Sequence, residues 1–155
     1  MASEKRKAAP ADLLVLEDFL PYRLSVLSNR VSRAIAARYA STFDLSIPEW
    51  RVIAVLGRQP GLSASEIVEA TEMDKVAVSR AVARLTAAKR IISRADPADA
   101  RRQLLWLSAQ GERVHARIAP VALESEQRLL SALGPDERAQ LDSLLNRLLQ
   151  AASAL

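Results

Sequence analysis

Apolar residues recur at helical spacing along most of the chain. Between Leu24 and Tyr39 they lie three or four positions apart, which predicts a long helix with one apolar stripe. We expect a short helix over Leu13–Leu20 before it, with Pro21 as the first residue of the longer helix. After Gly134-Pro135, a last helix carries a broader apolar face: Leu141, Leu144, Leu145, Leu148, Leu149 and Ala152. Both outer parts of the chain are therefore predicted to be helical.

In the middle of the chain, shorter helical segments alternate with turn signals. One helix is expected to begin at Ile47 and to end in a turn over residues 58–61. Ser63-Ala64-Ser65-Glu66 has the capping-box pattern that opens a helix, and this helix should end near residues 71–73. A longer helix follows over residues 74–89. Two helices joined by such a short turn form a helix-turn-helix candidate.

Strand-like alternation appears directly after these two helices. Residues 90–94 are predicted as a strand, residues 95–100 as a polar turn and residues 101–108 as a second strand, in which leucines flank Trp106. A β-hairpin that follows a helix-turn-helix is the arrangement called a winged helix. The middle of the chain is therefore predicted to be a winged helix-turn-helix.

The rest of the chain predicts a helical framework around this unit. Ser108 can cap a long helix that runs through Leu133, with Pro120 as a kink. The expected fold class is mainly α, an α+β winged helix-turn-helix with about six helices and a two-stranded wing. We expect a mobile tail at residues 1–11, a winged helix-turn-helix DNA-binding lobe at residues 48–108, and a helical dimerisation region made of residues 12–47 and 109–155.

Composition narrows the possible classes of protein. The 155 residues are 50% apolar and 26% charged, which is ordinary for one globular domain. The chain has no Cys, so disulfides, thiolate zinc sites, iron–sulfur clusters and thiol nucleophiles are excluded. No apolar run approaches the ~18 residues that a membrane span needs, and no secretory signal is recognisable. We therefore expect a cytoplasmic protein.

The positive charge is concentrated in the centre of the chain. The net charge is +4, but residues 75–102 alone carry eight Lys and Arg against two Asp, a balance of +6. Residues 121–155, in contrast, have a balance of −2. A basic segment between less basic flanks is typical of a module that binds phosphate groups. A solvated basic surface without a partner is the alternative.

The helix over residues 74–89 has a face suited to the major groove of DNA. Ser79 and Arg80 offer donors for base edges or phosphates, and Val76 could contact a thymine methyl group. The candidate DNA-binding residues of the helix-turn-helix are Ser63, Ser65, Lys75, Val76, Ser79, Arg80 and Arg84. An ordinary amphipathic surface helix is the alternative interpretation.

The predicted hairpin adds a second basic element. Asp99 lies two residues before Arg101, where its carboxylate could orient the guanidinium, and Arg102 supplies another donor. An oriented arginine on a thin projection suits a narrow, electronegative minor groove. The alternative is a surface ion pair that contributes about 0–1 kcal/mol.

Several of these segments resemble the MarR (multiple antibiotic resistance regulator) family. Residues 96–102, Asp-Pro-Ala-Asp-Ala-Arg-Arg, followed by Leu105-Trp106-Leu107-Ser108 and Gly111, are similar to the wing of that family. Residues 50–56 and Val78-Ser79-Arg80 are similar to its sequence on either side of the short helix. The resemblance spans residues 12 to 150, in the family's order.

The resemblance implies a homodimeric winged-helix repressor or activator. The N- and C-terminal helices would form the dimer, and a small-molecule pocket would lie near their junction with the DNA-binding lobes. Asp99 and Arg101 take the positions of the family's paired wing residues. Ala100 stands where many members carry Arg, so some charge of the wing is missing. Without Cys, the thiol-based sensing of some members cannot operate.

Candidates for contacts with a small molecule are few. Tyr22 and Trp50 could line a cavity, and His115 is the only histidine; packing roles are the alternative for all three. A lone His provides neither a metal-ligand set nor a catalytic triad, and no glycine-rich loop could cradle a phosphate. No metal, no cofactor and no enzymatic activity are therefore expected.

These features together predict a dimeric, sequence-specific DNA-binding regulator of transcription. We expect a repressor that a small-molecule effector relieves, acting on double-stranded DNA with an inverted-repeat operator. A non-specific architectural DNA-binding protein is one alternative, and it would share the basic patch without discriminating among sequences. A winged-helix module that binds a protein is the other, and it would tolerate the loss of Arg80 and Arg84.

Overall fold

The computed structural model describes residues 14–155, and the predicted tail at residues 1–11 lies outside them. Its elements follow in the order α1 (Leu20–Phe43), α2 (Ile47–Arg58), α3 (Ala64–Thr71), α4 (Lys75–Ala87), β1 (Ile91–Ala95), β2 (Gln103–Leu107), α5 (Ala109–Leu130) and α6 (Pro135–Ala152). The two strands pair in antiparallel fashion, with Ile91 opposite Leu107. The predicted fold class, helices with a two-stranded wing, is confirmed.

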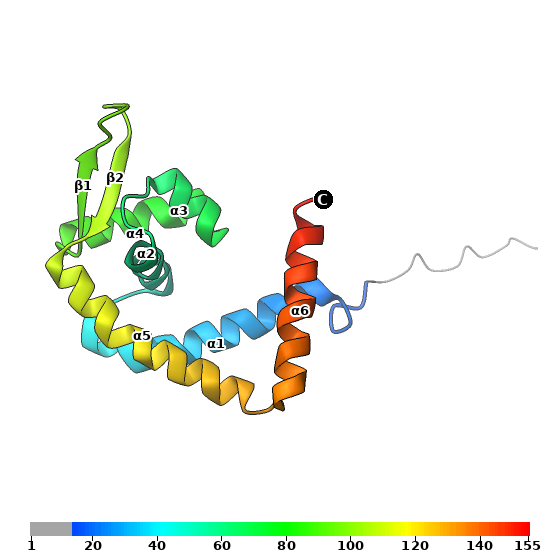
Figure 1. Ribbon diagram of the computed structural model, residues 1–155. Coiled ribbons are helices and arrows are strands. Elements are labelled where there is room, and N and C mark those ends of the chain that lie inside the picture. The colour runs from blue at the N-terminus through cyan, green and yellow to red at the C-terminus, as the bar shows by residue number, and fades with distance from the viewer. Residues whose placement is uncertain (1–13) are drawn as a thin grey trace, which may run out of the picture.

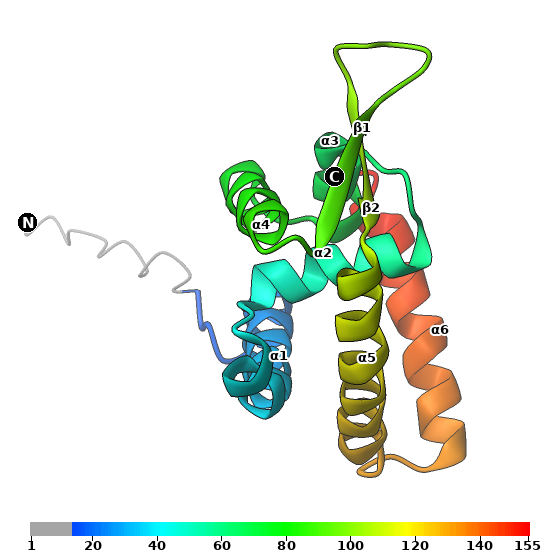
Figure 2. The ribbon, with the colours of Figure 1, turned by 90° about the vertical axis from the view of Figure 1, so that its left-hand side faces the viewer.

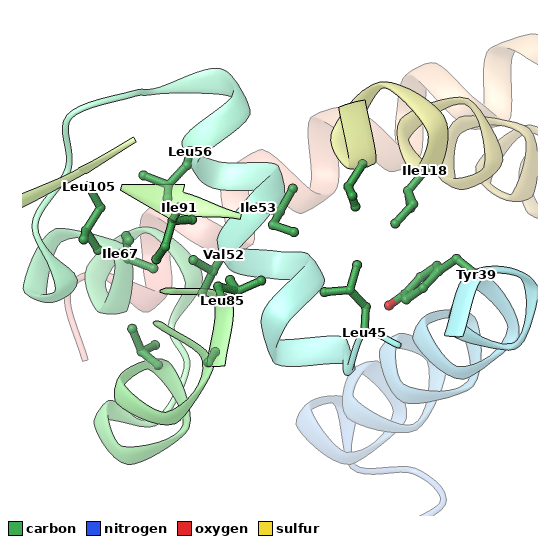
Figure 3. Close-up of a cluster of buried hydrophobic side chains, with 13 residues drawn as sticks. Tyr39, Leu45, Val52, Ile53, Leu56, Ile67, Leu85, Ile91, Leu105 and Ile118 are labelled. Atoms are coloured by element: carbon green, nitrogen blue, oxygen red, sulfur yellow. The ribbon is translucent and has the colours of Figure 1, made fainter. Parts of the chain in front are cut away.

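Helices α2, α3 and α4 and the hairpin form one lobe with a shared apolar core (Figure 3). The core is built from apolar residues that the sequence places on inward faces: Val52, Ile53 and Leu56 of α2, Ile67 of α3, Leu85 of α4, Ile91 of β1 and Leu105 of β2. Tyr39 and Ile118 extend the core toward α1 and α5. This continuous packing fixes α4 and the wing relative to each other.

Helices α1 and α5 lie side by side and carry the lobe (Figure 1). Arg38 of α1 joins them through an ion pair with Glu124 of α5, at 2.6 Å. The chain turns at residues 131–134, and α6 leads back from this turn. Figure 2 shows the wing at the opposite end of the molecule from the α5–α6 turn.

The predicted short helix over Leu13–Leu20 is wrong for the residues that the structure describes. Residues 16–18 form a turn, in which Asp18 N donates to Val15 O at 3.1 Å. In a helix continuing through Pro21, the proline ring would meet the carbonyl of Glu17, and the ring nitrogen has no hydrogen to donate. Helix α1 therefore begins at Leu20, with Pro21 in its second position.

Two other predicted boundaries also shift. Helix α5 continues through Pro120 and ends at Leu130 rather than Leu133, because a tighter turn follows and Gly134 already caps α6 in an extended conformation. Strand β2 begins at Gln103 rather than at Arg101. The amides of Arg101 and Arg102 both bond to Asp99 within the turn, so they are not available to the strand ladder.

Candidate nucleic-acid interface

Helix α3 begins at the capping box that the sequence predicts. The hydroxyl of Ser63 accepts a bond from Glu66 N at 3.3 Å, and Ser63 N donates to Glu66 Oε2 at 2.8 Å. Ser63 is buried, at 8% exposure, so its hydroxyl is occupied by the helix cap. Ser65, two residues on, is exposed. Of the two candidate serines, the structure therefore leaves only Ser65 open to a partner.

Helix α4 follows after a tight turn in which Glu72 adopts a left-handed conformation, with φ 52°. Asp74 caps the helix by accepting bonds from Val76 N at 2.9 Å and Ala77 N at 3.1 Å. The carboxylate thereby satisfies two amides that a helix start leaves without a partner. It also fixes the end of α4 that carries Lys75 and Val76.

The two faces of α4 differ in exposure. Val78, Ala81 and Leu85 are at most 3% exposed and pack into the core. The other face is exposed and carries the candidate residues Lys75, Val76, Ser79, Arg80 and Arg84. Val76 is an apolar residue that remains 54% exposed, which costs free energy unless a partner covers it.

A cleft between α3 and α4 brings three of these candidates together. The cleft has a volume of about 310 Å³, and Ser65, Lys75 and Ser79 contribute to its lining. Donors from two helices therefore converge on one part of the surface. Such convergence is what binding to a phosphate or a base edge requires.

The wing turn does not form the predicted pair between Asp99 and the guanidinium of Arg101. The carboxylate of Asp99 instead accepts the backbone N–H of Arg101 at 3.0 Å, and Asp96 accepts Ala98 N at 2.9 Å. Asp side chains in turns commonly bind the backbone amide two residues on, and this local bond takes the carboxylate first. Within residues 14–155, no ion pair engages Arg101, so its exposed guanidinium stays available.

Arg102, although exposed, joins the wing to α3. Its Nη2 lies 2.5 Å from Glu66 Oε1, and its Nη1 lies 3.8 Å from Asp96 Oδ2. The contact with Arg102, followed by the bonds from Ser63, lowers the pKa of Glu66 to about 2. In turn, Glu66 raises the pKa of Arg102.

Arg84 is also paired with a carboxylate. Its Nε lies 3.0 Å from Glu49 Oε1, and Glu49 is almost fully buried while the Arg84 side chain is 63% exposed. Sequence reasoning missed Glu49 and the pairing role of Glu66. The signal was present, because Ser46-Ile47-Pro48-Glu49 is a capping box like that of α3, and the structure forms it.

The three candidates for effector contacts are only partly brought together. The ring centroid of Trp50 lies 6.0 Å from that of Tyr39 and 5.9 Å from that of His115. Tyr22 is exposed in the first turn of α1, about 25 Å along the helix from Tyr39 at 1.5 Å per residue. Tyr22 therefore does not share a cavity with Trp50, and Tyr39 is the tyrosine that lies beside Trp50.

A small pocket of about 90 Å³ opens next to Trp50, between α1 and α2. Ser32, Tyr39 and Arg51 give it polar atoms, and Arg51 Nη2 donates to Ser32 Oγ at 3.2 Å. Burial raises the pKa of the Tyr39 hydroxyl; Arg51 opposes this shift. An aromatic wall with a cation and hydroxyl groups suits a small anionic or polar ligand.

Two other kinds of site are absent from the described part of the chain. Among residues 14–155, no cluster of three or more His, Asp or Glu side chains could hold a metal ion. None of the helices in that range is long and apolar enough to cross a membrane.

Comparison with known proteins agrees with this geometry. The sequence model of the MarR family matches residues 43–102, from the end of α1 to the wing. The transcriptional regulator HosA of Escherichia coli O111:H- is 27% identical over 108 residues, which cover 70% of this chain and 80% of HosA.

Solved structures are similar over nearly the whole chain. A MarR/EmrR family transcriptional regulator from Acinetobacter sp. ADP1 has a TM-score of 0.82 and 26% identity, covering 92% of this chain and 100% of the other. The PcaV transcriptional regulator from Streptomyces coelicolor, solved with its natural ligand, has a TM-score of 0.75 and 25% identity, covering 92% and 99%. All of these similar proteins are transcriptional regulators, which confirms the prediction that the chain is not an enzyme. In sequence and in fold, the chain is therefore similar to the MarR family of winged-helix transcriptional regulators.

Proposed function

We propose that this protein is a dimeric, sequence-specific repressor that binds an inverted-repeat operator and is released by a small molecule. The observation that carries the proposal is the exposed face of α4. Its buried side is locked into the core, and its open side presents Val76, Ser79 and Arg80 beside a basic wing. A rigid helix with one apolar and two polar contact residues is suited to reading base edges in the major groove.

Other basic residues would hold the DNA backbone rather than read it. Lys75 and Arg84 lie on the same open side of α4, and Arg101 projects from the wing turn. Contacts of Lys and Arg with phosphates supply affinity and orientation without sequence information. In this assignment α4 selects the site, and the wing adds a contact in the adjacent groove.

The proposed dimer rests on apolar surface that the monomer leaves uncovered. Helix α6 has no buried residue, and five of its leucines are at least 37% exposed: Leu141, Leu144, Leu145, Leu148 and Leu149. Leu24 and Leu27 of α1 are exposed as well. A two-fold dimer would cover these faces and place two α4 helices about 34 Å apart, one turn of B-DNA.

For the effector we propose the pocket beside Trp50. It lies where α1, from the proposed dimerisation region, meets α2, from the lobe that carries α4. A ligand that bound there could therefore favour one relative position of the two regions. PcaV, whose structure holds its natural ligand, has the same fold, which supports a small-molecule effector for this chain.

Selection of binding sites from a pool of random DNA duplexes tests this proposal. We expect an inverted repeat with half-sites about one helical turn apart, bound at least about 10³-fold more tightly than unrelated duplexes. A non-specific architectural protein would bind the pool without enriching a sequence. A winged-helix module for protein partners would bind no DNA, and either result would contradict the proposal. Action on chromosomal DNA also implies a cytoplasmic protein.

A further inference from the structure

Two glutamates of the lobe each perform two tasks with one carboxylate. Glu49 Oε2 accepts Ser46 N at 2.7 Å and so caps α2, and its Oε1 pairs with Arg84. Glu66 Oε2 accepts Ser63 N and so caps α3, and its Oε1 pairs with Arg102. A capping box needs only the first of these contacts. The second contact, in both cases, holds an arginine of an element proposed to face DNA.

The pair between Glu49 and Arg84 is the more informative of the two. Glu49 lies at the buried start of α2, whereas Arg84 belongs to the open face of α4. Their contact therefore joins two helices across a shallow cleft of about 270 Å³, which Arg80 also lines. No polar group of α4 other than Arg84 forms an ion pair with Glu49 among the described residues.

The geometry leaves the outer end of Arg84 available. Its contact with Glu49 is made by Nε, and within residues 14–155 its terminal nitrogens make no hydrogen bond. A guanidinium can donate from Nε to one group and from its terminal nitrogens to another. A long side chain that is held at Nε also has less rotational freedom to lose when it meets a phosphate.

We propose that Glu49 is a positioning residue for DNA binding: it holds Arg84 so that the terminal nitrogens of the guanidinium meet a phosphate of the DNA backbone. This inference rests on the proposed function, because it requires α4 to lie against DNA. Glu49 itself touches no DNA, since it is only 3% exposed. Its effect passes through Arg84 alone.

The alternative, on electrostatic grounds, is an opposite effect of Glu49. A carboxylate beside Arg84 could compete with the phosphate and weaken binding. Two observations favour positioning. Glu49 Oε2 already accepts Ser46 N as part of the helix cap, and Glu49 lies in the protein behind Arg84 rather than on the open side of α4. The terminal nitrogens are therefore not turned toward the carboxylate by a hydrogen bond.

A double-mutant cycle on the full-length protein tests the inference. The probe is a random-sequence duplex of about 30 base pairs, because a phosphate contact does not depend on sequence. We expect Arg84→Gln to weaken binding about tenfold, because it removes one charge-assisted contact. Glu49→Gln should weaken binding about fivefold, because it removes part of the same contact. In the Arg84→Gln background, Glu49→Gln should cause no further loss.

Three further measurements separate positioning from a structural role. The Nε–Hε signal of Arg84 in an NMR spectrum should shift in Glu49→Gln, whereas the amide spectrum of the core stays unchanged. Arg84→Lys keeps the charge on the surface but removes Nε, so it should weaken binding nearly as much as Arg84→Gln. Glu124→Gln, which breaks the Arg38 pair between α1 and α5, serves as the matched control and should bind like the parent.

Each outcome decides between the alternatives. If Glu49→Gln weakens binding equally in both backgrounds, its role is structural and the inference is overturned. Unchanged or tighter binding by Glu49→Gln overturns it as well, while leaving DNA binding intact. If the parent protein binds no duplex at all, the proposed function fails and the inference fails with it.

Discussion

Arg102 Nη2, in the wing, lies 2.5 Å from Oε1 of Glu66 at the start of α3. Next to this ion pair, the backbone of the wing also bonds to the segment before α3: Gly61 N donates to Leu105 O at 2.8 Å, and Leu105 N donates to Leu62 O at 2.9 Å. The wing is therefore attached to the helix-turn-helix by backbone bonds at its base and by a charged pair further along. This attachment determines where Arg101 is held relative to α4.

The pair makes the wing attachment sensitive to acid. Because the folded pKa of Glu66, about 2, lies below its ordinary value of 4.5, its contribution to stability is present above pH 4.5 and is lost as the pH falls toward 2. We expect Glu66→Gln to be less stable than the parent at neutral pH. The difference in the free energy of unfolding between the two proteins should shrink as the pH falls toward 2. Urea unfolding at a series of pH values measures this difference. A constant difference at all pH values would contradict the assignment.

Arg101 should contribute more to DNA binding than Asp99 does. Arg101→Ala removes a free guanidinium, so we expect weaker binding and a log–log salt slope smaller by about 0.9, as for one phosphate contact. Asp99→Ala removes only the bond to the backbone of Arg101 and should cause a smaller loss with the same slope. Binding titrations over a range of salt concentrations check both. Parent-like behaviour of both variants would remove the wing from the interface.

The sequence predicted the helix-turn-helix and wing because their signals are local. The capping box at Ser63 and the buried face of α4 follow from neighbouring residues, and the structure contains both. The partners of Arg84 and Arg102 could not be predicted, since they lie on other helices and packing brings them together.

The candidate pocket shows a second limit of sequence reasoning. Helical spacing identifies the face of α1 that is apolar, but it does not identify which turn of α1 meets the lobe. Tyr22 and Trp50 were therefore both named as residues that could line a cavity, although it is Tyr39, on a later turn, that lies beside Trp50. The packing of α1 against α2 and α5, which no local signal encodes, decides between the two tyrosines.

Gly111 should be required for the junction of α5 with the wing. A Cβ at this position would overlap the carbonyl oxygen of Arg90, which already accepts Ser108 N at 3.0 Å. Because the obstacle is backbone, it cannot turn aside, and we expect Gly111→Ala to destabilise the fold by about 1–3 kcal/mol. Chemical denaturation measures the loss. Gly134→Ala, whose Cβ would meet only the Glu137 side chain at 3.6 Å, is the control and should change stability far less.

Arg80 should determine which DNA sequence is preferred. It is exposed in the middle of α4, between the apolar contact residue Val76 and the phosphate-binding candidate Arg84. Loss of a base contact reduces discrimination by about 1–3 kcal/mol at the base pair concerned. We therefore expect Arg80→Ala to lose preference at one position of each half-site in a selection experiment. Recovery of the parent's preferred sequence would show that Arg80 does not contact bases.

The leucines of α6 should hold the proposed dimer together. Leu144 and Leu148 are one turn apart on α6 and are 52% and 44% exposed in the single chain. Placing two carboxylates in an apolar interface would cost more free energy than the burial of two leucines contributes. We therefore expect the double variant Leu144→Glu/Leu148→Glu to weaken dimerisation by about 3 kcal/mol or more, which is over a hundredfold. Operator affinity should fall with it, because a single lobe contacts only one half-site. Analytical ultracentrifugation and gel-shift assays measure the two losses. Gln150→Glu adds a charge on the opposite side of the same helix and should leave both unchanged. A double variant that remained dimeric would place the interface elsewhere.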